Sequence, residues 1–180
     1  MNKRMIIAVY PATFDPIHYG HIDIAKRAAC IFDEVITAAY SRPNKNVLFP
    51  IEERLELMRE SFKSITNIRV ASYDTLTVDF ARTHGAKVIV RGLRDVSDFE
   101  LEFKQALMYR HLMPDVEVVN LITNSEYGYV SSSLLKEVAM LGGDVDKLVP
   151  PHVAAAMHEK LKQMDAEARQ QVKMVALSND

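Results

Sequence analysis

Apolar runs and helical periodicities alternate along most of the chain. Residues 5–10 are apolar and rich in β-branched side chains, and turn residues follow them directly, which is typical of a buried parallel strand. From Ile22 onwards the apolar positions recur at helical spacing, which predicts a helix with one buried face. The alternation continues to a last helix that starts near Pro150. Five strands separated by helices indicate an α/β fold with one doubly wound, five-stranded, mostly parallel sheet of the Rossmann-like type.

The remaining elements follow from the same pattern. Further strands are expected over residues 34–40, 68–72, 87–90 and 116–123. Further helices are expected to start near residue 50, at 74 or 75, at 97 and at 131. Ser97 begins a Ser-x-x-Glu capping box, which is a helix start signal. In the long helix that follows, Phe99, Phe103 and Leu107 are expected to face the core.

Composition narrows the class of protein. The chain has 180 residues, 48% hydrophobic and 26% charged, with a net charge of −2, which suits one globular domain. We expect that domain over residues 1–165 and a polar tail or helix extension over residues 166–180. The near-neutral charge argues against a nucleic-acid partner. No apolar run is long enough to span a bilayer, so we expect no membrane partner and a cytoplasmic location.

On this topology the chemically informative residues gather at one edge of the sheet. Open parallel sheets bind ligands outside the carboxyl ends of their strands. His18 and His21 follow the first strand at a helix N-terminus, where backbone N–H groups and the helix dipole favour phosphate. Cations and hydroxyl groups follow later strands at Lys45, Arg91, Arg94 and residues 131–133. This collection fits a polyphosphate.

Absent motifs narrow the chemistry further. No G-x-G-x-x-G follows any strand and no Walker sequence is present, which argues against a dinucleotide or P-loop site. The sequence shows no clear metal-ligand cluster and no nucleophile beside a base. An acceptor that is a phosphate monoester is already anionic at neutral pH, so it needs no general base. The remaining work is to align the acceptor oxygen with the α-phosphorus and to neutralise developing charge.

The His-x-Gly-His turn at residues 18–21 resembles the nucleotidylyltransferase superfamily. The fuller string Thr-Phe-Asp-Pro at residues 13–16, followed by Gly-His, is similar to the bacterial phosphopantetheine adenylyltransferases. Their motifs match between about residues 5 and 160, and include Arg-Gly-Leu-Arg at 91–94, Asp-Phe-Glu-x-Glu at 98–102 and Val-Ser-Ser-Ser at 130–133. The resemblance implies transfer of AMP from ATP to 4′-phosphopantetheine, giving dephospho-coenzyme A and pyrophosphate.

The resemblance also implies roles for particular residues. His21 would bind the α-phosphate and stabilise the transition state, with Lys45 and Arg94 as further catalytic residues. Residues that would bind ATP are Thr13, Phe14, His18, His21, Gly92, Leu93, Arg94, Glu102, Tyr127, Gly128, Tyr129, Val130, Ser131, Ser132 and Ser133. Residues that would bind the acceptor are Thr13, Lys45, Thr77 and Arg91.

Cofactor and partners are implied in the same way. The family uses Mg²⁺ held mainly by the nucleotide phosphates, so no metal ligands are assigned to the chain. It forms homohexamers, and coenzyme A is a candidate feedback ligand. Ala12, Thr77 and Tyr109 differ from the residues usual in the family, and Thr77 and Tyr109 are expected beside the pantetheine arm of the acceptor.

Two alternatives stay open at this stage. One is another enzyme of the superfamily, a cytidylyltransferase or a mononucleotide adenylyltransferase, although these typically carry a different motif from the Val-Ser-Ser-Ser-Leu-Leu-Lys at residues 130–136. The other is a non-catalytic module that binds a nucleotide or coenzyme A on the same fold. Turnover of ATP in the presence of the acceptor separates both alternatives from the adenylyltransferase.

Overall fold

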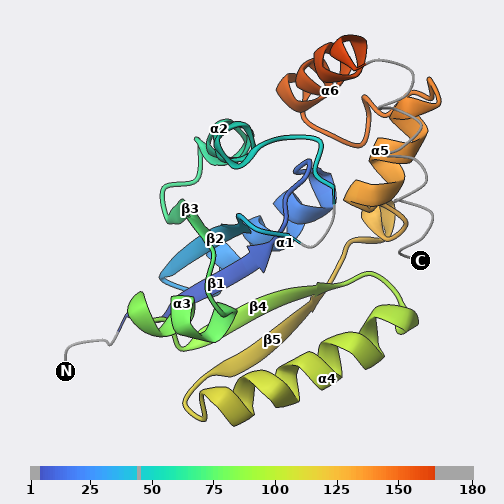
Figure 1. Cartoon of the computed structure of the whole chain (residues 1–180). Helices are drawn as coiled ribbons and strands as arrows, with labels where there is room; N and C mark the ends of the chain where they lie inside the picture. The colour runs from blue at the N-terminus through green and yellow to red at the C-terminus, as the bar shows by residue number, and fades with distance from the viewer. Residues whose placement is uncertain (1–4, 44–45, 165–180) are drawn as a thin grey trace.

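The chain folds around one parallel sheet (Figure 1). The computed structural model describes residues 5–43 and 46–164, so the expected tail at residues 166–180 lies outside the described residues. The sheet has the strand order β3-β2-β1-β4-β5, and every neighbouring pair is parallel. Its strands are β1 (Ile7–Ala12), β2 (Glu34–Tyr40), β3 (Ile68–Tyr73), β4 (Val88–Leu93) and β5 (Glu117–Ile122). This confirms the predicted five-stranded α/β fold.

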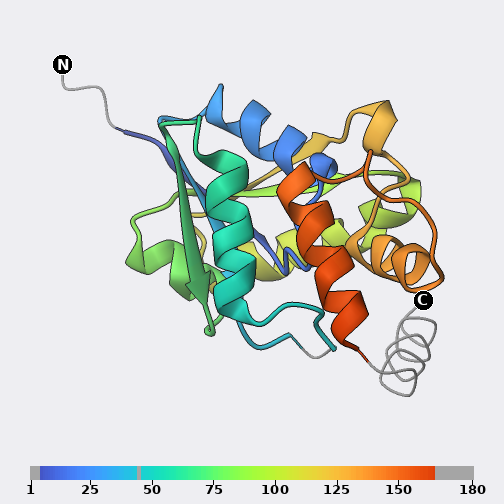
Figure 2. The same cartoon turned by 90° about the horizontal axis from the view of Figure 1, so that it is seen from above.

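Helices cover both faces of the sheet (Figure 1). They are α1 (Tyr19–Ala29), α2 (Ile51–Phe62), α3 (Thr77–Thr83), α4 (Val96–Leu112), α5 (Ser132–Met140) and α6 (Pro151–Gln163), with a 3₁₀ turn, η1 (Ser125–Tyr127). Helices α1 and α2 lie on one face, and α3 and α4 on the other. Figure 2 shows α2 and α6 side by side, where Lys160 binds Glu53 at 3.0 Å. None of the helices in residues 5–43 and 46–164 is long and apolar enough to cross a membrane.

The central strand supplies two separate cores. Successive side chains of a strand point to opposite faces, and in β1 Ala8 and Tyr10 belong to the core under α1 and α2 while Val9 belongs to the core under α3. All three are almost completely buried. A strand buried on both faces reads as a continuous apolar run, which is why β1 was evident from the sequence.

Three strands extend further than the apolar runs predict, and β3 does so by one residue, to Tyr73, which pairs with Tyr40 of β2. β1 continues to Ala12, which pairs with Ala39 of β2. β4 continues to Leu93, which pairs with Ile122 of β5. The prediction that Arg91 follows the fourth strand is therefore wrong, because Arg91 lies within β4. Its backbone pairs with that of β5, and the type of side chain at this position does not predict such pairing.

Two predicted helix starts also differ from the structure. Asp95, not Ser97, is the N-cap of α4, and its carboxylate accepts hydrogen bonds from the backbone N–H groups of Ser97 and Asp98. Helix α3 has Leu76 at its N-cap position with no side-chain bond, so the expected cap at residue 74 or 75 is wrong. Gly85 ends that region with a φ of 65°, a conformation that glycine adopts without strain.

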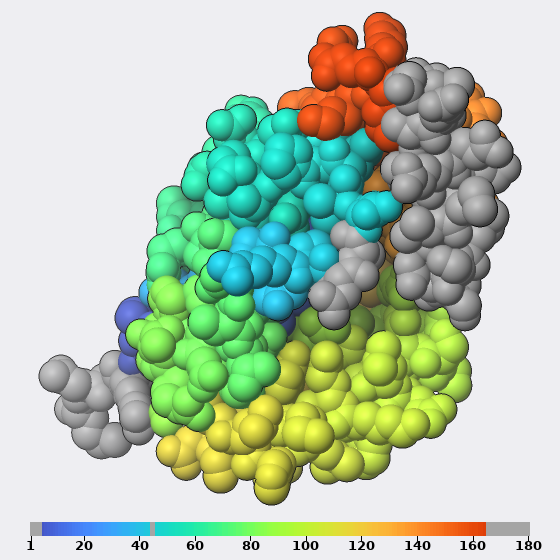
Figure 3. Space-filling model, in the orientation of Figure 1, coloured from blue at the N-terminus to red at the C-terminus, as the bar shows by residue number. Residues whose placement is uncertain are grey.

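Helix α4 presents the opposite face to the one that its apolar residues predict. Phe99, Phe103 and Leu107 are all more than half exposed, at 55%, 52% and 54%. The inward positions fall at helical spacing on Glu102, Gln105, Ala106 and Tyr109, which are buried or half-buried. The expectation of an apolar inner face is wrong because the inner face carries polar groups. Figure 3 shows α4, in yellow-green, along the lower surface of the molecule.

Candidate active site

His18 and His21 lie together at the start of α1. The helix begins at Tyr19, so His21 lies in its first turn, and His18 is the N-cap whose Nδ1 accepts a hydrogen bond from the His21 backbone N–H at 3.4 Å. The two imidazole rings stack with centroids 3.7 Å apart. Burial, with a smaller effect from the nearby charge of Arg94, lowers the pKa of His18 to about 3. His18 is therefore neutral at physiological pH and accepts the capping hydrogen bond.

The ring of His21 is enclosed on its other side by the first loop. Phe14 lies 4.9 Å from it between ring centroids and 5.5 Å from Tyr10. Phe14 has a φ of 52°, the one positive value of a residue other than glycine in the part of the chain that the structure describes. Such a conformation persists only where the surroundings hold it. The first loop is thus shaped to bring an aromatic side chain against His21.

Gly20 permits the close packing of the two imidazoles. A Cβ at this position would lie 3.1 Å from the His18 ring, which is tighter than ordinary van der Waals contact. Any larger residue would therefore displace the ring of His18. A glycine is therefore needed at this position of the His-x-Gly-His turn for a steric reason, and it also leaves the backbone accessible to a ligand.

Two pockets meet at this turn. The smaller, of ≈ 120 Å³, and the larger, of ≈ 450 Å³, share His21, Arg94, Ser131 and Ser132 as walls. The smaller pocket is completed by Tyr10, His18, Gly20, Ile24, Gly92, Thr123, Tyr127 and Val130. The larger is completed by Pro11, Ala12, Thr13, Phe14, Tyr40, Tyr73, Thr77, Arg91, Gln105, Tyr109 and Ser133. Two molecules bound in these pockets would meet beside His21 and Arg94.

Arg91 is fixed in the wall of the larger pocket. Its Nε and Nη2 donate hydrogen bonds to the two carboxylate oxygens of Glu102, each at 2.7 Å, and its Nη1 donates to the carbonyl of Pro11 at 2.9 Å. Burial alone would lower the pKa of Arg91, but the bonds to Glu102 outweigh it and raise that pKa. A guanidinium held at three points retains two further N–H donors for a ligand.

Arg94 is held from one side and stands at the boundary of both pockets. The carboxylate of Asp98 accepts hydrogen bonds from its Nε at 2.9 Å and its Nη2 at 2.8 Å. These bonds raise the pKa of Arg94 and lower the pKa of Asp98. The cation at the boundary between the pockets is therefore permanent over the physiological pH range.

The start of α5 supplies hydroxyl groups to the same place. Ser131 is the N-cap and accepts a hydrogen bond from the Leu134 backbone N–H at 3.1 Å. Ser132 donates to the carbonyl of Pro16 at 2.9 Å, which joins α5 to the first loop. The helix N-terminus and its serines thus face the two pockets, an arrangement that suits an anionic group.

Most of the predicted site residues converge at these pockets. Those that line one or both are Thr13, Phe14, His18, His21, Thr77, Arg91, Gly92, Arg94, Tyr127, Val130, Ser131, Ser132 and Ser133. Four others are close in sequence but line neither pocket: Leu93, Glu102, Gly128 and Tyr129. Their contact with ATP stays a prediction, and Glu102 instead binds Arg91. Lys45 lies outside the described residues.

Several lining residues were not identified from the sequence. They are Tyr10, Ile24 and Thr123 in the smaller pocket and Tyr40, Tyr73 and Gln105 in the larger. Tyr40 and Tyr73 end β2 and β3. Their position at the carboxyl edge of the sheet, where such folds bind ligands, could have identified them as site residues. Tyr73 also approaches Thr77, with hydroxyl oxygens 3.1 Å apart.

The donor groups of the pockets are basic or neutral. No Asp or Glu is among the described residues that line either one. Among residues 5–43 and 46–164, no group of three or more His, Cys, Asp or Glu side chains could hold a metal ion. These walls fit a metal that arrives with the phosphates of a ligand and takes its oxygen ligands from them.

Comparison with a family model and with solved structures identifies the general class of this protein. Residues 9–138 match the cytidylyltransferase-like family model. Among solved structures, the fold is similar to that of a Vibrio parahaemolyticus protein proposed to be a nicotinate-nucleotide adenylyltransferase, with a TM-score of 0.62, 16% identity and 86% and 99% of the two chains covered. This likeness supports the fold alone, and the class of protein, cytidylyltransferase-like, is shown by the family model.

Sequence relatives then define the family. The chain is 54% identical over 156 residues to a phosphopantetheine adenylyltransferase of Heliobacterium modesticaldum, covering 87% of this chain and 93% of the relative. It is 51% identical to the enzyme of that name from Alkaliphilus metalliredigens, covering 87% and 99%. The chain belongs to the phosphopantetheine adenylyltransferase family.

Proposed function

We propose that this chain transfers AMP from ATP to 4′-phosphopantetheine, giving dephospho-coenzyme A and pyrophosphate. The observation that carries the proposal is the meeting of two pockets at His21, Arg94 and the serines that start α5. A group-transfer enzyme with two substrates needs such a junction, because the reacting atoms must approach to about 3–3.5 Å. The two pockets therefore correspond to a donor and an acceptor.

The lining residues support an assignment of each pocket. The smaller one is walled by the first turn of α1 and by Tyr127, an aromatic ring available to a base. We assign it to the nucleotide. The larger one contains Arg91, Thr77 and three tyrosines around a greater volume, which suits a phosphate followed by a flexible polar arm. We assign it to 4′-phosphopantetheine, with Arg91 on its phosphate and Lys45 as a second cation.

The reaction would then be an in-line displacement at the α-phosphorus. The phosphate oxygen of the acceptor attacks, pyrophosphate leaves on the opposite side, and no general base is needed. His21 and Arg94, at the boundary of the pockets, stabilise the charge that develops on the transferred group. The serine hydroxyls and N–H groups at the start of α5 receive the β- and γ-phosphates.

We propose Mg²⁺ as the cofactor, held by the nucleotide phosphates. The walls of both pockets, which lack carboxylates, support a metal that depends on phosphate oxygens for its ligands. When bound, the ion would neutralise part of the charge of the triphosphate. The chain's own contribution is the set of fixed cations and hydroxyl groups around that ion.

We also propose that the chain forms a homohexamer, acts in the cytoplasm and binds coenzyme A as a feedback ligand. The outer face of α4 supports assembly, since Val96, Phe99, Leu101, Phe103, Leu107 and Met108 are all more than half exposed. Apolar patches of this kind mark protein contacts. The acceptor pocket would accommodate the pantetheine part of coenzyme A, which is shared with the substrate.

The reaction is tested by measuring pyrophosphate release from ATP with and without 4′-phosphopantetheine. The proposal predicts release only when both substrates are present, and much slower release with CTP. A preference for CTP would indicate another enzyme of the superfamily. Binding of ATP and acceptor without any release, even at high enzyme concentration, would indicate a non-catalytic binding module.

A further inference from the structure

A buried ion pair joins the first loop to α5 without lining either pocket. The ammonium of Lys136 donates a hydrogen bond to Oδ2 of Asp15 at 2.7 Å. Asp15 is 1% exposed and Lys136 6% exposed. Removing two charges from water costs free energy, so the burial of this ion pair does not by itself indicate that the pair stabilises the fold. The position of the pair in the fold offers a different role.

The carboxylate of Asp15 also binds a third segment. It accepts hydrogen bonds from the backbone N–H groups of Leu48 at 2.9 Å and Phe49 at 2.9 Å. Lys136 reaches the same segment, since its Nζ lies 3.4 Å from the carbonyl oxygen of Asn46. One ion pair therefore connects the loop after β1, the segment that leads from β2 into α2, and α5.

Each of these connections leads to a wall of the site. Lys136 lies one turn beyond Ser132, which binds the first loop through the Pro16 carbonyl. The start of α5 is thus tied to the first loop at two points. Asp15 directly follows Phe14, whose positive φ brings its ring against His21. The pair thus connects the loop that carries Phe14 to the helix that carries the serines.

We propose that Asp15 and Lys136 are positioning residues for the transfer reaction. They touch neither pocket, and they act by holding Phe14, and through it His21, in register with the start of α5. The inference rests on the proposed function. Misplacing a reacting group by about 1 Å lowers the rate by about 100-fold, so loss of the pair should reduce kcat more than it weakens ATP binding.

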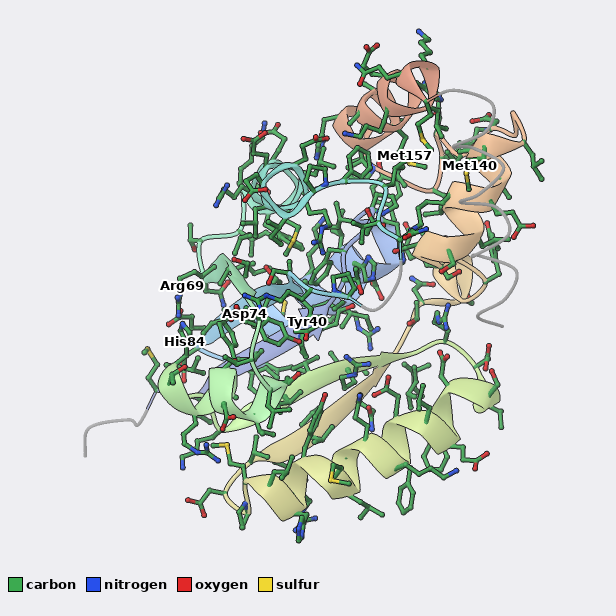
Figure 4. The ribbon with its side chains drawn as sticks, in the orientation of Figure 1. Tyr40, Arg69, Asp74, His84, Met140 and Met157 are labelled. Carbon is green, nitrogen blue, oxygen red and sulfur yellow. The ribbon has the colours of Figure 1, made fainter. Side chains whose placement is uncertain are left out.

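The test uses the full chain and three variants. Lys136→Met removes the cation, and the double variant Asp15→Asn with Lys136→Met removes both charges, which a buried site tolerates better than one unpaired charge. Met157→Ala is the matched control for destabilisation, because Met157 is fully buried on α6, well apart from Tyr40 of the larger pocket (Figure 4). Melting temperature, the ATP dissociation constant and kcat per folded molecule are measured for each.

The expected result is a fall in kcat of about tenfold to 100-fold for Lys136→Met, with the ATP dissociation constant within about threefold. The double variant should show a similar fall, and Met157→Ala should keep kcat within about twofold. If Lys136→Met does not fold, the double variant decides. Wild-type kcat in the double variant, or an equal loss in Met157→Ala, overturns the positioning role. Absence of turnover in the wild-type chain would instead overturn the proposed function.

Discussion

The imidazole of His18 lies face to face with that of His21, with ring planes 25° apart and centroids at 3.7 Å. His18 caps α1 and His21 faces both pockets. A protonated His18 would place a positive charge beside the position proposed for the transferred phosphate, but it would also lose the lone pair that accepts the capping bond. Its low pKa keeps the cap intact.

The pKa of His18 has a consequence for acid stability. It is about 3 in the folded chain, whereas an unfolded chain has the ordinary histidine pKa of 6.5, so the unfolded chain binds the proton first as pH falls. The stability that a neutral His18 provides is present above pH 6.5 and is lost progressively towards pH 3. At pH 5 the loss is about 2 kcal/mol.

We therefore expect His18→Thr, which keeps an oxygen acceptor at the N-cap, to be less sensitive to acid than the wild-type chain. The measurement is the free energy of unfolding from urea titrations at pH 7 and pH 5. The matched control is His111→Gln, at an exposed histidine, which should follow the wild-type chain. Equal acid sensitivity in His18→Thr would contradict the assignment.

His21→Ala should remove transition-state stabilisation while leaving most of the nucleotide contacts. We expect kcat to fall by about 10²–10³. ATP binding, measured by isothermal titration calorimetry, should largely survive because Arg94 and the start of α5 remain. Turnover equal to that of the wild-type chain would remove His21 from the mechanism.

Arg91→Lys should weaken acceptor binding selectively. A lysine ammonium cannot reproduce the planar two-point pairing with Glu102 together with the bond to Pro11. We expect the KM for 4′-phosphopantetheine to rise at least about tenfold, with little change in the KM for ATP. The control is Arg69→Lys on β3, because Arg69 forms a partly exposed ion pair with Glu34 of β2. A larger change in the KM for ATP than for the acceptor would reverse the assignment of the pockets.

Phe103→Glu should disrupt the proposed hexamer, since a carboxylate would be buried in an apolar contact if the outer face of α4 is the interface. Phe99 and Phe103 stack on the outer face of α4, with ring centroids 5.9 Å apart, so the charge would lie in the middle of the exposed patch. The mass in solution, measured by analytical ultracentrifugation, should fall below that of a hexamer. Phe103→Tyr should assemble like the wild-type chain. A hexamer formed by Phe103→Glu would show that this face is not the contact.

The sequence predicted the parts of the fold that are buried on both faces. β1 and β2 are mostly apolar runs, and the carboxyl edge of the sheet could be located from them. The end of β4 could not be found in this way, because Arg91, Gly92 and Leu93 are held by pairing with β5, and no local pattern reports a partner strand.

Helix α4 shows why periodicity alone fails where the buried face of a helix carries polar side chains. Its Glu102 binds Arg91 of β4, and such a contact between two elements cannot be predicted from the helical spacing of apolar residues. The site could be predicted where several of its residues lie close together in a short motif, as His18 and His21 do. Tyr40 was missed because an aromatic residue that ends a mostly apolar strand looks like core, and Tyr73 was missed because the third strand was predicted to end at residue 72.

The shape of the first loop was also only partly predictable. Ala12, which the sequence analysis singles out as a departure from the family pattern, has no positive φ. The unusual backbone angle falls on Phe14 instead, next to Asp15. Asp15 is bound by Lys136 of α5, a contact between residues far apart in the sequence that no local pattern predicts.

The most direct test of the account is a structure of the chain with a non-hydrolysable ATP analogue and 4′-phosphopantetheine bound together. We predict the α-phosphate beside His21 and Arg94, the nucleoside on the side of Tyr127, and the acceptor phosphate at Arg91 with its arm towards Thr77. The acceptor oxygen should lie about 3–3.5 Å from the α-phosphorus, opposite the leaving pyrophosphate. A nucleotide in the larger pocket, or reacting groups that do not meet at His21, would contradict it.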